Sequence, residues 1–157
     1  MKKLNKLEAV LWNVALPGFS QLLTGRIIVG FLFLVLEIVI NVNSRFNVAI
    51  IHSFHWEISK AIHVVDYQWL MFYPCLYMYA MWDAYRHAMP ETEKYSYLPF
   101  VFGAYFVTVG LIYSTTLRLF GVMFGPVFLP MLFLIPGLLI GGLIRYFLLK
   151  SKTMNQA

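Results

Sequence analysis

The sequence predicts an all-α integral membrane protein with about four transmembrane helices, an N-terminal interfacial or re-entrant amphipathic helix and an amphipathic helix on the outer face. Of its 157 residues, 61% are hydrophobic and only 12% are charged, whereas soluble domains carry about 25% charged residues. The mean hydropathy is +0.72, and several apolar stretches approach the roughly 20 residues that a helix needs to cross a bilayer. These properties exclude an ordinary soluble enzyme and predict a single membrane domain over residues 1–157.

The first apolar segment, residues 3–23, is expected to lie on the cytoplasmic side of the membrane as an amphipathic helix. Lysines accompany its apolar residues, which favours binding at an anionic lipid surface. Pro17-Gly18 would end this helix, and the chain would then dip before the first span. A fifth, kinked span is the alternative. The apolar residues at helical spacing are Leu4, Leu7, Leu11 and Val14.

Four later segments are expected to cross the membrane, at about residues 24–42, 68–85, 97–117 and 127–149. The positive charges decide between four and five spans, because cytoplasmic loops carry an excess of lysine and arginine. If all five segments crossed, the 12 basic residues would be divided equally between the two sides. With four spans, all of them except Arg45, Lys60 and Arg118 lie on one side, which predicts that both termini are cytoplasmic.

The longest segment between spans, at about residues 49–66, is expected to form an amphipathic helix on the outer leaflet. Helical geometry would place His52, His55 and His63 on its polar face. Such histidines can bind zinc or respond to acidification. Because their spacing is not that of a metal motif, a solvated polar face is the simplest interpretation, and no metal is expected.

Glu37 is the charged residue that membrane insertion by itself does not explain. It lies about 15 Å along the first span by helix rise, where a carboxylate costs about 2.5–3.5 kcal/mol unless it is paired, protonated or exposed to water. Asn41 lies one turn further along the same face, and Tyr73 and Tyr77 on the second span are candidate hydrogen-bond donors. The cluster is interpreted as a structural hydrogen bond between helices, a proton or cation relay, or a contact with a partner subunit.

Two further pairs of residues are candidates for holding helices together. Asp83 and Arg145 both fall near the inner ends of their spans and are candidates for an ion pair, with Arg86 as an alternative partner for Asp83. Gly137 and Gly141 form a small-xxx-small element, which permits two helices to approach closely.

The segment Pro17-Gly-Phe-Ser-Gln21-Leu-Leu-Thr-Gly25-Arg26 resembles a motif of other membrane proteins. It is similar to the P-G-x-G-Q-x-x-x-G start of a helical hairpin in small, mostly uncharacterised bacterial membrane proteins, with Ser20 in place of the second glycine. It is also distantly similar to the two-helix hairpin domain whose linker carries an aromatic-Tyr-x-Gly motif. The resemblance covers about residues 14–36 and implies a bacterial multi-pass protein. In it Gly18 and Gly25 permit tight turns, and Gln21 hydrogen-bonds freed backbone groups.

The sequence contains no G-x-S-x-G elbow, no glycine-rich phosphate loop and no H-E-x-x-H motif. We therefore expect a non-enzymatic subunit, scaffold or accessory factor of a complex in the bacterial cytoplasmic membrane, with no cofactor and no nucleic-acid partner. The expected partners are the lipid bilayer and either another membrane protein or further copies of this chain. One alternative is an oligomeric ion, proton or small-solute transporter or channel that uses Glu37 and Asn41. Another is a pH or metal sensor that uses the three histidines.

Overall fold

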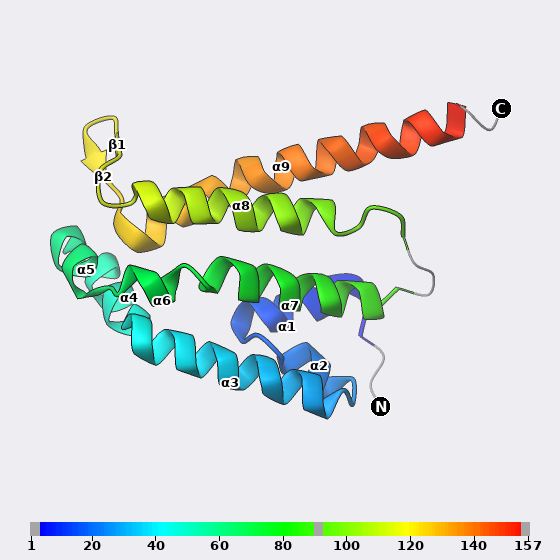
Figure 1. Ribbon diagram of the computed structural model, residues 1–157, viewed down its shortest axis with the longest axis horizontal. Coiled ribbons are helices and arrows are strands. Elements are labelled where there is room, and N and C mark those ends of the chain that lie inside the picture. The colour runs from blue at the N-terminus through cyan, green and yellow to red at the C-terminus, as the bar shows by residue number, and fades with distance from the viewer. Residues whose placement is uncertain (1–3, 90–92, 155–157) are drawn as a thin grey trace.

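The computed structural model describes residues 4–89 and 93–154, with side chains as far as residue 151, and this part of the chain is a bundle of helices (Figure 1). The all-α class is therefore confirmed. Two helical segments, Ile27–Ser44 and Gly125–Ser151, are long and apolar enough to cross a membrane, and Leu98–Tyr113 is a shorter apolar helix. The helices are α1 (Lys6–Ala15), α2 (Phe19–Leu23), α3 (Ile27–Ser44), α4 (Phe46–Phe54), α5 (Ile58–Val64), α6 (Tyr67–Leu70), α7 (Tyr73–His87), α8 (Leu98–Tyr113) and α9 (Gly125–Met154).

The first predicted segment forms a hairpin of two helices, in which α1 ends just before Pro17-Gly18 as expected and α2 follows. The Asn5 side chain caps α1 by accepting a hydrogen bond from the Glu8 amide, and the chain reverses at Pro17-Gly18 into α2. Asn13 is fully buried and holds this turn, because its Oδ1 accepts a 2.7 Å hydrogen bond from the Gly18 amide. The helix α1 packs against α7, and α2 packs against α3. Residue 3, where the predicted segment begins, lies outside the described residues. So do both chain termini, which were expected to be cytoplasmic.

The predicted single helix over residues 49–66 is wrong, because the chain forms two short helices there. The break falls at Trp56, whose φ of 62° is left-handed and ends α4 before α5 begins. A second left-handed residue, Arg45 (φ 55°), separates α3 from α4 and turns the chain back over the end of α3. Apolar periodicity continues through both turns and so does not reveal them.

The helices observed in the predicted span segments also differ from them in their boundaries. The segment at 68–85 is divided, because α6 ends at Leu70 and α7 starts at Tyr73, with Pro74 in its first turn. The helix predicted for 97–117 ends at Tyr113. It is followed by a two-stranded antiparallel ribbon of β1 (Arg118–Leu119) and β2 (Val122–Met123). The last helix, α9, continues through Pro130 and Pro136 and extends as far as Met154.

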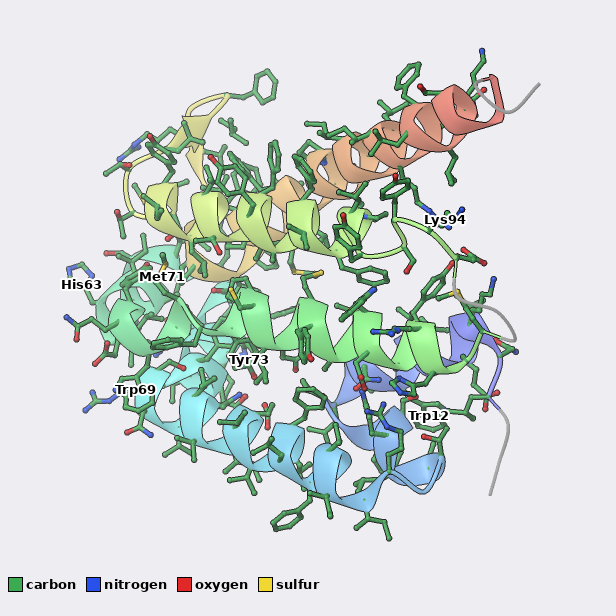
Figure 2. All side chains as sticks on the ribbon, turned by 45° about the vertical axis from the view of Figure 1, so that its right-hand side comes forward. Trp12, His63, Trp69, Met71, Tyr73 and Lys94 are labelled. Carbon is green, nitrogen blue, oxygen red and sulfur yellow. The ribbon has the colours of Figure 1, made fainter. Side chains whose placement is uncertain are left out.

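Successive long helices run in opposite directions between the two ends of the bundle (Figure 1). We define the Ser44 end by the hydrogen bonds that join Ser44 to Asp66 and Tyr67 to Ser114. The opposite end, called the Arg26 end, contains the ion pairs that join Arg26 to Asp83 and Arg145 to Glu93. Figure 2 shows His63 and Trp69 at the first end and Lys94 and Trp12 at the second. The helices α8 and α9 lie against each other, and α7 lies against α8.

Candidate functional site

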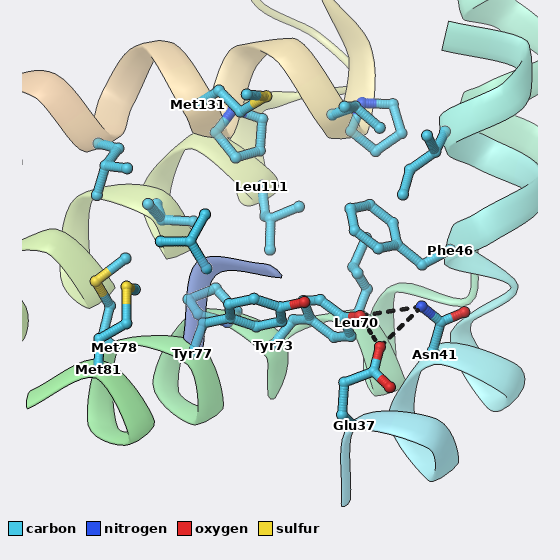
Figure 3. A pocket seen from close by; sticks show the side chains of 18 of the residues that line it. Glu37, Asn41, Phe46, Leu70, Tyr73, Tyr77, Met78, Met81, Leu111 and Met131 are labelled. Carbon is cyan, nitrogen blue, oxygen red and sulfur yellow. Dashed lines mark hydrogen bonds between the residues drawn. The ribbon is translucent and has the colours of Figure 1, made fainter. Parts of the chain in front are cut away.

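A cavity of about 660 Å³ lies among the helices of the bundle (Figure 3). Residues of α1, α3, α4, α7, α8 and α9 line it, and most of these side chains are apolar. A volume of this size falls within the range of about 300–1,000 Å³ that is typical of small-molecule sites. The cavity is therefore the candidate binding site in the described part of the chain.

Polar side chains gather at one corner of the cavity, where α3 faces α7. Glu37 is 9% exposed. Its Oε1 accepts a 2.7 Å hydrogen bond from the Tyr73 hydroxyl and a 3.3 Å hydrogen bond from Asn41 Nδ2. Asn41 Nδ2 also lies 3.0 Å from the Tyr73 hydroxyl oxygen, which closes a triangle of contacts (Figure 3). The structure thus brings together three of the four residues that the sequence proposed for this cluster.

Tyr77, the fourth of these residues, joins the site through its aromatic ring. Its ring stacks on that of Tyr73 with centroids 4.9 Å apart and an interplanar angle of 30°. Because the two tyrosines are one helical turn apart on α7, both rings face the cavity side by side. Figure 3 shows the two rings lying along the same wall, next to the Glu37 carboxylate.

Two residues of α4 complete this corner, and the sequence analysis missed both. Asn47 Oδ1 accepts a 3.1 Å hydrogen bond from Asn41 Nδ2, and the ring of Phe46 lies 5.0 Å from that of Tyr73. They reach the site because the left-handed turn at Arg45 folds α4 back toward α3. Helical periodicity carries no signal for such a reversal, so neither residue could have been assigned from the sequence.

The rest of the cavity is apolar and opens to the outside of the bundle. Met78 and Met81 lie at the end of the cavity away from Glu37 (Figure 3). Leu111 and Met131 lie across the cavity from the two tyrosine rings. Large apolar lining residues that are more than half exposed include Val14 on α1, Phe54 on α4 and Met131 on α9. The cavity therefore reaches the surface of the bundle at these residues.

At the Arg26 end, Asp83 joins the α1–α2 hairpin to α7. Its carboxylate accepts hydrogen bonds from Arg26 Nη1 at 2.5 Å and from Gln21 Nε2 at 2.9 Å. Gln21 is 1% exposed, and its Nε2 also donates to the Ala80 carbonyl at 3.0 Å. Gln21 therefore bonds a backbone carbonyl of the neighbouring helix α7 as well as the Asp83 carboxylate.

The predicted ion pair between Asp83 and Arg145 is not formed, and Asp83 does not pair with Arg86. Arg145 Nη2 donates to Glu93 at 2.5 Å, while Arg86 lies over the Trp82 ring. Both arginines considered from the sequence do lie near the expected end of the bundle. The partners differ because the hairpin places Arg26 closer to Asp83, and no helical pattern reports that placement.

Glu93, which the sequence analysis did not select, is the centre of an ion-pair network. Its carboxylate accepts hydrogen bonds from Lys6, Arg145 and the Tyr85 hydroxyl. The hydrogen bond from Lys6, followed by that from Arg145, lowers the pKa of Glu93 to about 2. This network joins α1, α7 and α9 at the Arg26 end.

Gly18 allows the α1–α2 hairpin to approach α3. Its φ is +96°, and a Cβ at this position would lie 2.2 Å from the Gly30 carbonyl oxygen. Pro17 is fully buried beside it. The turn that ends α2 has a left-handed glycine too, at Gly25. Both glycines of the motif thus occupy the turns where the sequence analysis expected them.

Close packing of α8 on α9 depends on Gly137 and Gly141. A Cβ on Gly137 would lie 2.7 Å from the Phe102 carbonyl oxygen, and one on Gly141 would lie 2.6 Å from the Leu98 carbonyl oxygen. These glycines therefore let the two helix backbones approach each other. The contact lies within the chain, so this element already has a partner in α8.

The three histidines do not share one continuous helix face, because the chain breaks at Trp56. His52 Nδ1 lies 2.7 Å from Glu57 Oε2, and His63 Nδ1 lies 2.7 Å from the Ser59 carbonyl oxygen. His55 is the C-cap residue of α4. Hydrogen bonds from Lys60 and His52 lower the pKa of Glu57. Within the described segments, no group of three or more His, Cys, Asp or Glu side chains is arranged to hold a metal ion.

Comparison with known proteins found no relative of this chain. No family model matches the chain, and neither the curated proteins nor the solved structures contain a match.

Proposed function

We propose that this chain is a non-enzymatic accessory protein of a membrane, with four membrane-crossing helices and a lateral cavity that binds a lipid-soluble molecule with a polar head. The observation that carries the proposal is the cavity of about 660 Å³, whose apolar wall is interrupted at one corner by the Glu37 cluster. Such a division matches an amphiphile, since its tail needs apolar surface and its head needs hydrogen-bond partners.

The exposed surface of the long helices supports the membrane part of the proposal. Only 28% of each of the two long apolar windows is buried, whereas the core helix of a soluble protein is mostly buried. Large apolar side chains are exposed along α3, including Ile28 (85%) and Phe31 (60%). A surface of this kind is stable against lipid and is rarely left open to water.

The path of the chain supports four crossings, although α7 and α8 are short. Together α6 and α7 run from Tyr67, which bonds Ser114 at the Ser44 end, to His87, which lies beside Arg26 at the other end. The segment that contains α8 runs back from Lys94, whose carbonyl bonds Arg145, to Ser114, the C-cap residue of α8. Each segment therefore covers the length of the bundle between the same two ends as α3 and α9.

Basic residues support the orientation. Arg45, Lys60 and Arg118 belong to the Ser44 end, while the Arg26 end contains Lys6, Arg26, Arg86, Lys94 and Arg145. The positive-inside rule then places the Arg26 end in the cytoplasm. The α1–α2 hairpin enters and leaves the bundle at that end, which is the geometry of a re-entrant segment packed against protein.

A binding role fits the side chains of the cavity better than catalysis does. Its lining contains no serine, cysteine or histidine among the described residues, so the Ser–His and Cys–His pairs of common nucleophilic sites are not formed there. Binding through apolar contact and a few hydrogen bonds needs neither group.

The topology is tested by cysteine labelling of protein reconstituted in vesicles, on a Cys75→Ser background because Cys75 is exposed. We expect single cysteines at Lys60 and Lys94 to react with a membrane-impermeant maleimide from opposite sides of the bilayer. Labelling of both positions from the same side would contradict four crossings.

Binding is tested with a long-chain alcohol that carries a photoreactive diazirine on its tail, added to the protein in phosphatidylcholine vesicles. We expect the label to concentrate on cavity residues such as Met78, Met81 and Leu111. A tryptophan at Leu134, which lines the cavity, should reduce this labelling, while one at Leu132, which is on the same helix but outside the lining, should not. Labelling spread evenly over the exposed helix faces would overturn the proposed binding.

A further inference from the structure

Glu37 is the residue that identifies the chemistry of the head group, if the cavity binds an amphiphile as proposed above. It is an acid in a lining that contains no lysine, arginine or histidine among the described residues. A carboxylate in such surroundings is costly unless a positive charge lies beside it. The site is thus complementary to a cation that the described part of the chain does not supply.

The two oxygens of the Glu37 carboxylate have different surroundings. Oε1 accepts the hydrogen bonds from Tyr73 and Asn41. Within the described residues, Oε2 accepts no hydrogen bond. It is also not among the fully buried polar atoms that lack a partner, so it is partly accessible. In Figure 3 no dashed line reaches this second oxygen. It is therefore the acceptor that remains for a donor on the ligand.

Aromatic rings surround the same corner. The rings of Tyr73 and Tyr77 are stacked with centroids 4.9 Å apart, and the Phe46 ring lies 5.0 Å from that of Tyr73. The face of an aromatic ring attracts a cation, and the attraction increases when the cation is shielded from water. A carboxylate beside aromatic faces therefore favours an ammonium over a neutral hydroxyl and disfavours an anion.

The remainder of the cavity accommodates an aliphatic tail. Met78, Met81 and Leu111 line the part away from Glu37, and methionine side chains adapt readily to the shape of a flexible chain. The exposed lining residues Val14, Phe54 and Met131 would allow such a molecule to enter from the bilayer under the proposed topology.

We propose that the cavity binds a membrane-soluble organic cation, namely an ammonium head on an aliphatic tail, with Glu37 as its counter-charge and with Tyr73, Tyr77 and Phe46 around its head. This inference rests on the proposed function and specifies its ligand class. No covalent or redox step is involved, because the ligand is held by an ion pair, cation–π contacts and apolar packing.

The test compares two photoreactive probes with the same diazirine-bearing chain, a primary amine and an alcohol, on the full-length protein in phosphatidylcholine vesicles. We expect the amine to label cavity residues at lower concentration than the alcohol. Glu37→Gln should reduce labelling by the amine about tenfold or more, because removing one member of a buried charge pair costs more than the 1.4 kcal/mol that tenfold represents. It should leave labelling by the alcohol nearly unchanged.

Glu57→Gln is the matched control, because it removes the same charge from a residue outside the lining. It should change neither labelling. If Glu37→Gln does not fold, Glu37→Asp replaces it in the test. It keeps the negative charge and should therefore preserve the preference for the amine. On the unaltered protein, excess unlabelled long-chain amine should protect the cavity better than the corresponding alcohol does.

Two results separate failure of this inference from failure of the proposed function. Equal labelling of the cavity by both probes, unaffected by Glu37→Gln, would overturn the cation assignment and leave amphiphile binding intact. If neither probe labels the cavity above the exposed helix faces, both the cation assignment and the proposed binding role are overturned.

Discussion

Arg26, the N-cap residue of α3, forms a two-point contact with Asp83 of α7. Arg26 Nη1 donates to Asp83 Oδ2 at 2.5 Å, and Nη2 donates to Oδ1 at 3.2 Å. The Asp83 side chain is 12% exposed and the Arg26 side chain 27% exposed. A paired arginine and carboxylate with this fork geometry is stronger than a single surface ion pair. The contact thus joins the start of α3, which directly follows the α1–α2 hairpin, to α7.

We expect Arg26→Lys to destabilise the protein, because lysine cannot make the two parallel hydrogen bonds. The loss should be about 1.5–3 kcal/mol, as for a hydrogen bond to a charged group. It is measured by thermal unfolding in detergent micelles. Arg86→Lys is the control, since Arg86 lies over the Trp82 ring and does not bond Asp83. Equal effects of the two variants would contradict this role of Arg26.

Stability should depend on pH through Glu93, outside the proposed spans. Its pKa is lowered from 4.5 to about 2 by Lys6 and Arg145. Because the folded state has the lower pKa, the stabilisation is complete above the unfolded value of 4.5 and is lost as the pH falls toward 2. The difference in melting temperature between the unaltered protein and Glu93→Gln should therefore shrink over this interval. A difference that stays constant through the interval would contradict the assignment.

Gly141 and Gly142 provide a matched test of the α8–α9 contact. A Cβ on Gly141 would lie 2.6 Å from the Leu98 carbonyl oxygen, whereas one on Gly142 would meet nothing within 4 Å. We expect Gly141→Ala to lower the free energy of unfolding by about 1–3 kcal/mol through overpacking. Gly142→Ala should be neutral or should stabilise by up to about 1 kcal/mol, since alanine favours helix. Destabilisation of both variants to the same extent would exclude the close approach as the cause.

The turn of the β-ribbon contains a strained residue. Leu119 pairs with Val122, which leaves Phe120 and Gly121 as a two-residue loop in which both φ angles are positive, at 52° and 79°. Such turns favour Asn-Gly, and the Phe120 side chain is fully exposed and packs on nothing that would offset the strain. We therefore expect Phe120→Asn to stabilise the ribbon by about 1 kcal/mol.

Hydrogen exchange of the ribbon amides measures this effect, and about 1 kcal/mol corresponds to roughly fivefold slower exchange where opening is local. Phe120→Ala is the control, because alanine lacks the short polar side chain that lets asparagine adopt the left-handed backbone. An equal gain from alanine and asparagine would show that loss of the exposed ring, and not relief of the backbone, is responsible.

Part of the candidate site could be predicted from the sequence, because depth along a helix follows from residue number. Glu37 and Asn41 share a face of one helix, and Tyr73 and Tyr77 share a face of another. Their approximate depths sufficed to propose the hydrogen bond between Tyr73 and Glu37, which the structure contains. Asn47 and Phe46 could not be added, since their approach depends on the backbone conformation of Arg45.

The sequence by itself determined the helical class, the apolar segments and the residues whose polarity conflicts with their apolar surroundings. These properties are local, because each depends on the cost of transferring a side chain or a helical segment away from water. Only the tertiary structure decided that Asp83 pairs with Arg26 and Arg145 with Glu93, that residues 49–66 are divided at Trp56, and that a cavity adjoins Glu37. Those features depend on which backbones approach each other and where the chain reverses. The physical reason is that close packing and left-handed turns are set by contacts between distant segments, which leave no periodic pattern in the sequence.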